Sequence, residues 1–583
     1  MAAGLPHPHH VLLVLVLLPS LLRPGAVEMA PTPAAAAGSG DEGDSALLGL
    51  LLRVQSEALR ALGPDGFDPK LYVDLPLAAD ERAAAAALPG QGQAPPSRAE
   101  LESYLARYFG AVGSDLVAAD PLDFEAEPRG FLPRVESSEA RAWALEVHAI
   151  WKELARQVAP GVVARPDRHT LLPLPGGVVV PGSRFREVYY WDSYWVVRGL
   201  LVSKMYDTAK HIVLNLVSMV EKYGFVLNGA RSYYTNRSQP PLLSSMVLEV
   251  YRATGDVEFV KGAFRFLLKE HSFWTSEIHK VTIRDNHGQD EELASKINSI
   301  ADKEKLYHQI ASTAESGWDF SSRWMRNSTD MTTLATTYII PVDLNTFIFK
   351  MEQDIAAFAK IIGDNATSEK FLEASKARHI AIDSILWNSE MEQWLDYWLP
   401  TDGDSQQGVY QWKSDSQNRK IFASNFFPLW LNAYHSESAK FADTAKSERV
   451  MASLQKSGLL CAAGIATSLT NTSQQWDFPN GWAPVQHLIA EGLLHSGSEE
   501  AIKLAEDIAT RWLRTNYAAY KATGAMHEKY DVEACGKSGG GGEYKPQTGF
   551  GWSNGVVLSF LEEFGWPKHK EIDCSRQGEV GLA

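Results

Sequence analysis

The sequence predicts an all-α protein in which successive helices form a closed ring of helix pairs. Apolar residues recur three and four positions apart over most of the chain from Glu100 onward, as they do on the buried face of a helix. Alternating apolar and polar runs, which predict strands, are few. The absence of a fixed-period sequence repeat favours a closed ring over an open superhelical array. Long loops rich in Gly, Pro and Trp join the helices and are expected to carry function.

The helical pattern can be followed along the chain. Residues 212–220 carry one apolar stripe, and residues 243–251 carry another that ends near Gly255. Asp256 can then cap a further helix, because its carboxylate accepts hydrogen bonds from free backbone N–H groups. The remaining predicted helices cover residues 344–358, residues 501–513 and a final apolar segment that begins with residues 550–555.

Composition excludes several classes of function. The 583 residues are 45% hydrophobic and 22% charged, which is typical of a globular protein with a sizeable core. The formal net charge of −16 disfavours binding to nucleic acid or to anionic membranes. The 17 tryptophans suit stacking against sugar rings, and the three cysteines are too few for a disulfide scaffold. The cysteines and histidines show no spacing typical of a metal site, so no metal is expected.

The N-terminus carries an apolar run at residues 11–22 that is too short for a typical membrane-spanning helix. We interpret residues 1–26 as a secretory signal peptide, with an uncleaved membrane anchor as the alternative because histidines replace the usual basic residues. Residues 27–60, rich in Ala, Pro and Gly, are expected to be disordered, and residues 568–583 form a polar tail. The expected location is the secretory pathway, with the main domain extracellular or anchored at the plasma membrane.

Two further features are expected at the surface. Residues 83–97 are of low complexity and predict a loop. Glycosylation sequons begin at Asn236, Asn327, Asn365 and Asn471, and Asn365 is the best candidate because it lies in a polar turn. The oligomeric state cannot be inferred from these features.

A carboxylate lies between aromatic residues in the stretch 314–324 (AESGWDFSSRW). Asp319 is flanked by Trp318 and Phe320, and poor solvation raises the pKa of a carboxyl group in such surroundings. A carboxylic acid that keeps its proton near neutral pH can protonate a leaving oxygen. A buried structural aspartate is the alternative.

Three other loops combine charged and aromatic residues in a way that suits binding of a polyol. The first, residues 181–195 (PGSRFREVYYWDSYW), holds Arg184, Trp191 and Asp192. The second, residues 228–241, offers amide and guanidinium groups for hydroxyls. The third, residues 475–484 (QWDFPNGWAP), contains Asp477, which is either a second reactive carboxylate or a turn former.

A second candidate for the chemistry is Glu528. It stands between His527 and Lys529, whose positive charge is expected to keep it ionised, as a general base requires. The following glycine stretch, residues 539–544 (GGGGEY), predicts a mobile lid that ends in Glu543. Two carboxylates in opposite environments, surrounded by Trp- and Arg-rich loops, favour glycoside hydrolysis.

These loops together resemble the signatures of the trehalase family. Residues 181–195 resemble the first signature with Ser183 in place of a glycine, and QWDFPNGWAP matches the second in full. The stretches ESGWDFSSRW, HEKYD and GGGGEY stand where the family has them. The resemblance runs from about Phe67-Asp68-Pro69-Lys70 to Trp566. Within the family, the chain is similar to the plant branch, as in the segment FLEEFGWP.

The resemblance implies a single catalytic domain over residues 61–567, with an (α/α)6 toroid fold and no cofactor. It implies inverting hydrolysis of α,α-trehalose to two glucose molecules, with Asp319 as general acid and Glu528 as general base, about 6.5–9.5 Å apart. It also implies substrate contacts from the set Arg184, Trp191, Asp192, Asn228, Arg237, Ser238, Gln239, Gly317 and Glu543.

One segment departs from the family pattern. Trehalases carry an Arg-Pro-Glu-Ser segment that binds sugar hydroxyls, and residues 280–306 lack it and are shortened. The alternative is therefore a catalytically weakened, trehalase-like sugar-binding protein. A toroidal hydrolase of another α-glucoside is a further alternative.

Overall fold

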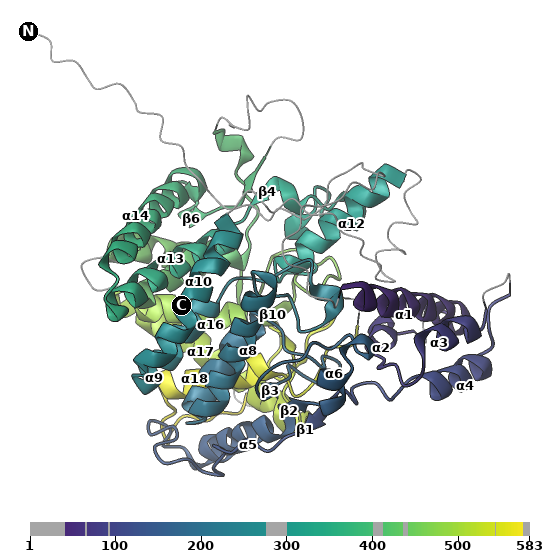
Figure 1. Ribbon diagram of the computed structural model, residues 1–583. Coiled ribbons are helices and arrows are strands. Elements are labelled where there is room, and N and C mark those ends of the chain that lie inside the picture. The colour runs from purple at the N-terminus through teal and green to yellow at the C-terminus, as the bar shows by residue number, and fades with distance from the viewer. Residues whose placement is uncertain are drawn as a thin grey trace, which may run out of the picture.

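The computed structural model (Figure 1) describes residues 41–64, 67–90, 94–275, 300–399, 412–434, 441–542 and 544–574, except for the side chains of 41–45 and 300–304. Six helices form a closed inner ring, in which each packs against the next and the last packs against the first. In ring order they are α7 (Asp192–Val202), α9 (Leu243–Thr254), α13 (Val342–Ile362), η9 (Ala423–Tyr434), α16 (Ala483–Leu494) and α18 (Gly551–Phe564).

Six further helices form an outer layer and pack against the inner ring. They are α5 (Ser138–Leu154), α8 (Tyr206–Tyr223), α10 (Val257–Thr275), α14 (Asn365–Ala381), α15 (Thr444–Lys456) and α17 (Glu499–Thr523). The predicted (α/α)6 toroid is therefore confirmed. The predicted helices lie in α8, α9, α10, α13, α17 and α18, and the carboxylate of Asp256 accepts from the Phe259 N–H at 2.9 Å as the predicted cap.

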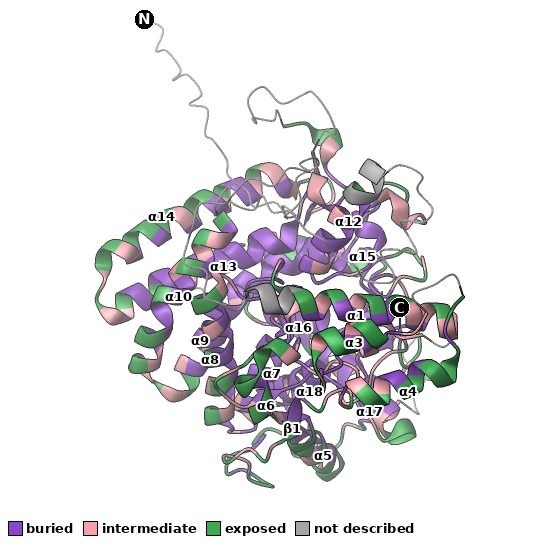
Figure 2. Cartoon of the chain, turned by 45° about the vertical axis from the view of Figure 1, so that its right-hand side comes forward, coloured by how far each residue is buried: buried purple, intermediate pink, exposed green. Residues whose placement is uncertain are grey.

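Burial distinguishes the two layers. Figure 2 shows the inner helix α13 buried along most of its length, whereas the outer helix α14 alternates between buried and exposed residues. The closest contact in the ring joins α7 to α18. A Cβ added to Gly555 would lie 2.0 Å from the Trp195 carbonyl oxygen, and one added to Gly199 would lie 2.6 Å from the Gly555 Cα. Glycine at both positions allows the two helix backbones to approach this closely.

A helical layer with a core of its own precedes the toroid. It comprises α1 (Asp41–Leu62), α2 (Pro69–Val73), α3 (Glu81–Ala87) and α4 (Arg98–Tyr108), beside the ring in Figure 1. The prediction of disorder over residues 27–60 is wrong from Asp41 onward, because Leu47, Leu50, Leu51 and Val54 form a buried helical stripe. The loop predicted at residues 83–97 is also partly wrong. Its alanines, which favour helix, belong to α3.

Apart from α12, which has 16 residues, the remaining elements are short. The helical ones are α6 (Pro160–Ala164), α12 (Ile300–Glu315), η2 (Pro166–Arg168), η3 (Ser232–Tyr234), η4 (Ser322–Trp324), η5 (Met331–Thr333), η6 (Thr336–Tyr338), η7 (Ile382–Leu386) and η8 (Ser414–Ser416). The strands are β1 (Leu116–Ala118), β2 (Ala155–Val158), β3 (Val178–Val179), β4 (Ile339–Ile340), β5 (Trp387–Asn388), β6 (Gln393–Trp394), β7 (Tyr397–Trp398), β8 (Leu460–Cys461), β9 (Gly464–Ile465), β10 (Asn480–Trp482) and β11 (Lys529–Asp531). They pair antiparallel as β1-β2-β3, β4-β7, β5-β6, β8-β9 and β10-β11.

Several predictions concern parts of the chain outside the described residues. These are the signal peptide or anchor at 1–26, the start of the segment 27–60, residues 276–299 within the shortened region, and the end of the polar tail from 575. Among the described helices, none is both long and apolar enough to cross a bilayer.

Candidate active site

The loops that carry the predicted site residues lead into the N-terminal ends of inner helices. Residues 181–191 precede α7, residues 226–242 precede α9 and residues 316–341 precede α13. Residues 475–482 and 527–550 likewise lead into α16 and α18. Because these helices stand side by side in one ring, the fold brings together loops that are far apart in the sequence.

Two adjoining cavities lie among these loops. The inner cavity, of about 70 Å³, is lined by Trp191, Asp192, Gly317, Gln475, Trp476, Trp482, Glu528, Phe550 and Trp552. The outer cavity, of about 170 Å³, is lined by Pro69, Lys70, Val73, Arg184, Asn228, Tyr233, Tyr234, Arg237, Ile310, Ala314 and Phe320. Phe185, Tyr189, Gln239, Asp319 and Tyr544 line both. Asp319 therefore stands where the two cavities meet.

A rigid turn places Asp319. Gly317 has a φ of 76°, and a Cβ at this position would lie 2.9 Å from the Trp191 ring, so the turn requires glycine. The Gln475 side chain donates a hydrogen bond to the Asp319 carbonyl oxygen. Burial raises the pKa of the Asp319 carboxyl from 3.8 to about 7, with a further increase from the charge of Glu528 and opposition from Arg237 and Lys529. A carboxyl with this pKa can hold a proton near neutral pH.

The loop beyond Asp319 is held by ion pairs. The Arg323 guanidinium donates to Asp343 at 2.6 and 2.8 Å and to Asp396 at 2.7 and 2.8 Å, and it stacks 4.8 Å from the Trp318 ring. Asp477 was a second candidate for the chemistry. Its carboxylate is fully buried and instead accepts hydrogen bonds from Ser321, Ser322, Ser468 and Thr472. It lines neither cavity, and its contacts are those of a structural residue that anchors this loop.

Glu528 is the residue directly before β11, and it lines the inner cavity. The pairing of Trp482 with Lys529 across β10 and β11 brings it beside the tryptophan wall. Its carboxylate accepts from the Tyr544 hydroxyl at 2.7 Å and from the Gln547 N–H at 3.1 Å. We expected flanking positive charge to keep Glu528 ionised, but burial dominates and raises its pKa, while Lys529 and these two donors oppose the increase. The expected partner His527 points elsewhere, because its Nε2 lies 3.0 Å from the Thr523 hydroxyl.

A third carboxyl group shares the inner cavity. Asp192 is the first residue of α7, and burial together with the charges of Glu528 and Asp319 raises its pKa to about 8. Three acidic groups in a small cavity cannot all ionise readily at neutral pH. Asp192 is thus expected to be protonated and to act as a hydrogen-bond donor as well as an acceptor.

Most of the predicted substrate-binding residues line one of the cavities. Trp191, Asp192 and Gly317 line the inner cavity, and Gln239 lines both. Arg184, Asn228 and Arg237 line only the outer one. The side chain of Ser238 lines neither, because its hydroxyl donates to the Val226 carbonyl oxygen at 2.6 Å. Glu543 lies outside the described residues.

The contacts of three residues around the cavities, Lys529, Tyr544 and Asp68, were not predicted from the sequence. Lys529 donates to the Gln475 side chain at 2.9 Å, and burial lowers its pKa to about 8. Tyr544 was noted only as the end of the glycine stretch, and Asp68 only as part of the family resemblance. Gln475 lies in the motif QWDFPNGWAP and Tyr544 in GGGGEY, so their position within these motifs could have marked them as site residues. Asp68 lies outside these motifs and caps α2 in the N-terminal helical layer. Its place beside the cavity is therefore visible only in the folded structure.

The glycine stretch before Glu543 is hydrogen-bonded to its surroundings. Gly540 exchanges two hydrogen bonds with the Asn480 side chain, at 2.9 and 3.0 Å. The N–H groups of Gly539 and Gly542 donate to the carbonyl oxygens of Lys529 and Ser473, each at 2.9 Å. The predicted lid movement therefore requires these bonds to break, and it stays a prediction.

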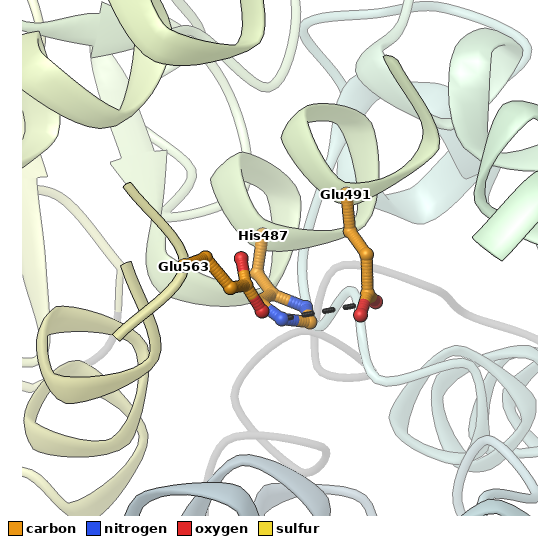
Figure 3. A group of neighbouring side chains, drawn as sticks. All are labelled: His487, Glu491 and Glu563. Atoms are coloured by element: carbon orange, nitrogen blue, oxygen red, sulfur yellow. Dashed lines mark ion pairs between the residues drawn. The ribbon is translucent and has the colours of Figure 1, made fainter. Parts of the chain in front are cut away.

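One cluster of metal-ligand types occurs among the described residues. It consists of His487 and Glu491 from α16 and Glu563 from α18, with a His487–Glu491 distance of 3.8 Å (Figure 3). Arg198 already pairs with Glu491 at 2.7 Å and with Glu563 at 2.5 Å. Glu563 lies about 18 Å along α18 from its first residue, at the rise of an α-helix. The cluster is thus at the end of the ring away from the cavities, and both of its carboxylates pair with Arg198.

Comparisons with known proteins agree with this geometry. The trehalase family profile matches residues 65–565. A probable trehalase of Oryza sativa subsp. japonica is 75% identical, covering 94% of this chain and 100% of its own length. A trehalase of Arabidopsis thaliana is 49% identical, covering 91% of this chain and 87% of its own.

A solved structure supports the same assignment. The neutral trehalase of Saccharomyces cerevisiae matches with a TM-score of 0.51 and 27% identity, over 67% of this chain and 73% of the yeast chain. Because the profile covers most of the sequence and close relatives match nearly end to end, the chain belongs to the trehalase family.

Proposed function

We propose that this protein hydrolyses α,α-trehalose to two glucose molecules by an inverting mechanism. The single observation that carries the proposal is the position of Asp319 where the two cavities meet, with Glu528 in the inner cavity alone. A disaccharide with one ring in each cavity places its bridging oxygen beside Asp319. The family relationship supplies the substrate, since the relatives at 75% and 49% identity are a probable trehalase and a trehalase.

Asp319 is the general acid in this mechanism. With a pKa of about 7, its carboxyl can keep a proton at neutral pH and give it to the bridging oxygen as the outer glucose leaves. Burial causes this protonation, so the group is ready before the substrate binds. Arg237, which lowers the pKa of Asp319, limits the increase and prevents the acid from becoming too weak.

Glu528 is the general base. Its carboxylate deprotonates a water molecule that attacks the inner glucose from the face opposite the leaving oxygen. The Tyr544 hydroxyl and the Gln547 N–H both donate to this carboxylate, which fixes its orientation and favours its ionised form. The stacked rings of Trp476 and Trp482, 4.2 Å apart, form an apolar wall that suits the C–H face of the sugar.

Replacing either carboxyl group is expected to abolish turnover while trehalose still binds. Asp319→Asn and Glu528→Gln should each lower kcat by about 10²–10⁴-fold, the usual contribution of a general acid or base. Glucose release and calorimetric trehalose binding measure the two effects. Asp364→Asn is the control, because Asp364 caps α14 far from the cavities and asparagine is an equally good cap. Near-normal activity of Asp319→Asn would end the assignment.

The weaker alternative is a sugar-binding protein without turnover. It rested on the missing Arg-Pro-Glu segment, and most of that region lies outside the described residues. The assembled pair of Asp319 and Glu528 favours hydrolysis. A panel of trehalose, maltose and other α-glucosides measures whether the preference is for trehalose.

We also propose that the chain enters the secretory pathway, as a secreted or membrane-anchored glycoprotein. The apolar run at residues 11–22 supports this, and so does the disulfide between Cys535 and Cys574, since such bonds form in oxidising compartments. Asn365 is exposed at the start of α14 and open to glycosylation. Expression in a eukaryotic secretory host, followed by N-terminal sequencing and a glycosidase mobility shift absent from Asn365→Gln, tests these points.

A further inference from the structure

The guanidinium of Arg184 in the outer cavity is held by a residue from outside the toroid. Its Nε donates to one Asp68 oxygen at 3.1 Å, and its Nη2 donates to the other at 2.8 Å. This two-point contact fixes the plane of the guanidinium group. Its Nη1 makes no hydrogen bond to any described residue, and Arg184 lines the outer cavity, so this nitrogen is available for a ligand.

Asp68 itself is fixed at the start of a short helix that forms part of the cavity wall. Its carboxylate accepts from the Lys70 N–H at 3.1 Å and caps α2. Pro69, Lys70 and Val73 of this helix line the outer cavity. The helical layer therefore provides both a wall of the cavity and the anchor of its arginine.

Buried charges hold α2 against the toroid. The Lys70 ammonium pairs with Asp74 at 3.1 Å and with Glu187 at 2.7 Å, and Glu187 pairs in turn with Arg231 at 3.0 Å. All four side chains are almost fully buried. A buried charge network with several partners has a well-defined geometry, because every displaced group loses partners that water cannot replace. The position of Asp68 relative to the cavity is thus well determined.

We propose that Asp68 is a positioning residue for the outer glucose site, acting through Arg184, and that the N-terminal helical layer completes this site. The proposal rests on the proposed function, because it assumes that the leaving glucose occupies the outer cavity. Asp68 holds two of the arginine's N–H groups and leaves Nη1 to donate to a sugar hydroxyl. Without Asp68 the Arg184 side chain can adopt more rotamers. It then spends less time in the rotamer that directs Nη1 toward the sugar hydroxyl.

Asp68→Ser separates this role from the cap. Serine caps a helix as well as aspartate does. Its side chain is shorter and has a single neutral oxygen, so it cannot accept hydrogen bonds from both Nε and Nη2 of Arg184 as the carboxylate does. We expect kcat/KM for trehalose to fall about tenfold, mainly through KM, as for the loss of one charge-assisted hydrogen bond. Asp80→Ser is the matched control, because Asp80 caps α3 in the same helical layer and lines neither cavity.

Hydrolysis of α-glucosyl fluoride distinguishes a role in the outer glucose site from a general structural role of Asp68. This substrate carries one glucose unit and a small leaving group, so it uses the inner cavity and leaves the outer one empty. We expect Asp68→Ser to hydrolyse it within about twofold of the wild-type rate, and to add no further loss on trehalose when Arg184 is already replaced by glutamine. A parallel fall on both substrates, or an unchanged KM for trehalose, overturns the proposal.

Binding separates this proposal from the proposed function. If the wild-type protein hydrolyses neither substrate, the proposed function fails. Calorimetric titration of Asp319→Asn with trehalose still measures the outer site, without turnover. Adding Asp68→Ser should weaken this binding about tenfold, whereas equal affinity with and without the substitution contradicts the positioning role.

Discussion

At the scale of residues, the chemistry depends on how burial distributes protons among neighbouring acids. Asp319, Glu528 and Asp192 line one small cavity, and burial raises the pKa of each. Only Glu528 accepts hydrogen bonds from both a phenol and a backbone N–H, and these favour its ionised form. In the proposed mechanism, the same desolvation leaves Asp319 as the acid and allows Glu528 to serve as the base.

The pH dependence of kcat/KM should follow these two groups. Activity should fall as the pH rises through about 7, because Asp319 loses the proton it must donate. It should also fall on the acidic side as Glu528 becomes protonated, at a pH above the ordinary 4.5 of a glutamate. Tyr544→Phe removes a donor to the carboxylate, so the acidic limb should move to higher pH while the alkaline limb stays. A shift of only the alkaline limb would contradict these assignments.

At the scale of elements, the site depends on how closely inner helices approach each other. Asp192 begins α7 and Phe550 directly precedes α18, and these two helices meet backbone to backbone at Gly199 and Gly555. No side chain separates the two helices at this point, so the distance between their loops is set by the glycines. A wider separation would move Asp192 relative to the base-bearing loop, and misplacement by about 1 Å can cost 10²-fold in rate.

Gly555→Ala should therefore destabilise the protein by about 3 kcal/mol or more, because the added carbon would meet the Trp195 carbonyl oxygen at 2.0 Å. Gly262→Ala in α10 is the matched control. Nothing lies within 4 Å of its added carbon, and alanine should stabilise an exposed helix interior by roughly 0.5–1 kcal/mol. Thermal unfolding of both variants measures the difference, and equal melting temperatures would show that α7 and α18 can separate freely.

Helices whose apolar pattern continues over many residues could be predicted from the sequence. Features that depend on tertiary contacts could not. The stripe at residues 243–251 needs only local spacing to be recognised, and it is α9. The role of Asp477 could not be read locally, since its partners Ser321 and Ser322 are distant along the chain. The direction of the shift in the pKa of Glu528 was misjudged for the same reason. Its neighbours in sequence are cationic, but its pKa is decided mainly by burial in the folded protein.

At the scale of the whole molecule, the fold encloses more acidic groups than its mechanism uses. Burial raises the pKa of Asp192 and Glu270 to about 8 and of Glu315 and Asp319 to about 7. All four ionise near pH 4 in the unfolded chain. At these four sites the folded protein therefore binds more protons than the unfolded chain between about pH 4 and pH 8. The contribution of these groups to the free energy of unfolding is fully present below about pH 4. It is lost as the pH rises through their pKa values in the folded protein.

The free energy of unfolding should accordingly fall by roughly 3–5 kcal/mol between pH 6.5 and pH 8. Buried histidines such as His487, whose pKa is about 3, act in the opposite direction but mainly below pH 6.5. Urea unfolding at the two pH values measures the change. Glu270→Gln should flatten the dependence, because glutamine does not ionise and can still accept from the Tyr190 hydroxyl. A stability that increases over this interval would contradict the assigned protonation states.

The most direct test of the paired roles of Asp319 and Glu528 is the anomeric form of the glucose first released from trehalose, followed by proton NMR before mutarotation. Attack of water on the inner ring, opposite the leaving oxygen, converts that glucose to the β-anomer, while the departing glucose keeps its α configuration. The predicted early products are therefore equal amounts of α- and β-glucose. Early release of α-glucose alone would indicate a retaining mechanism and would contradict the assignment of Glu528 as the base that activates water.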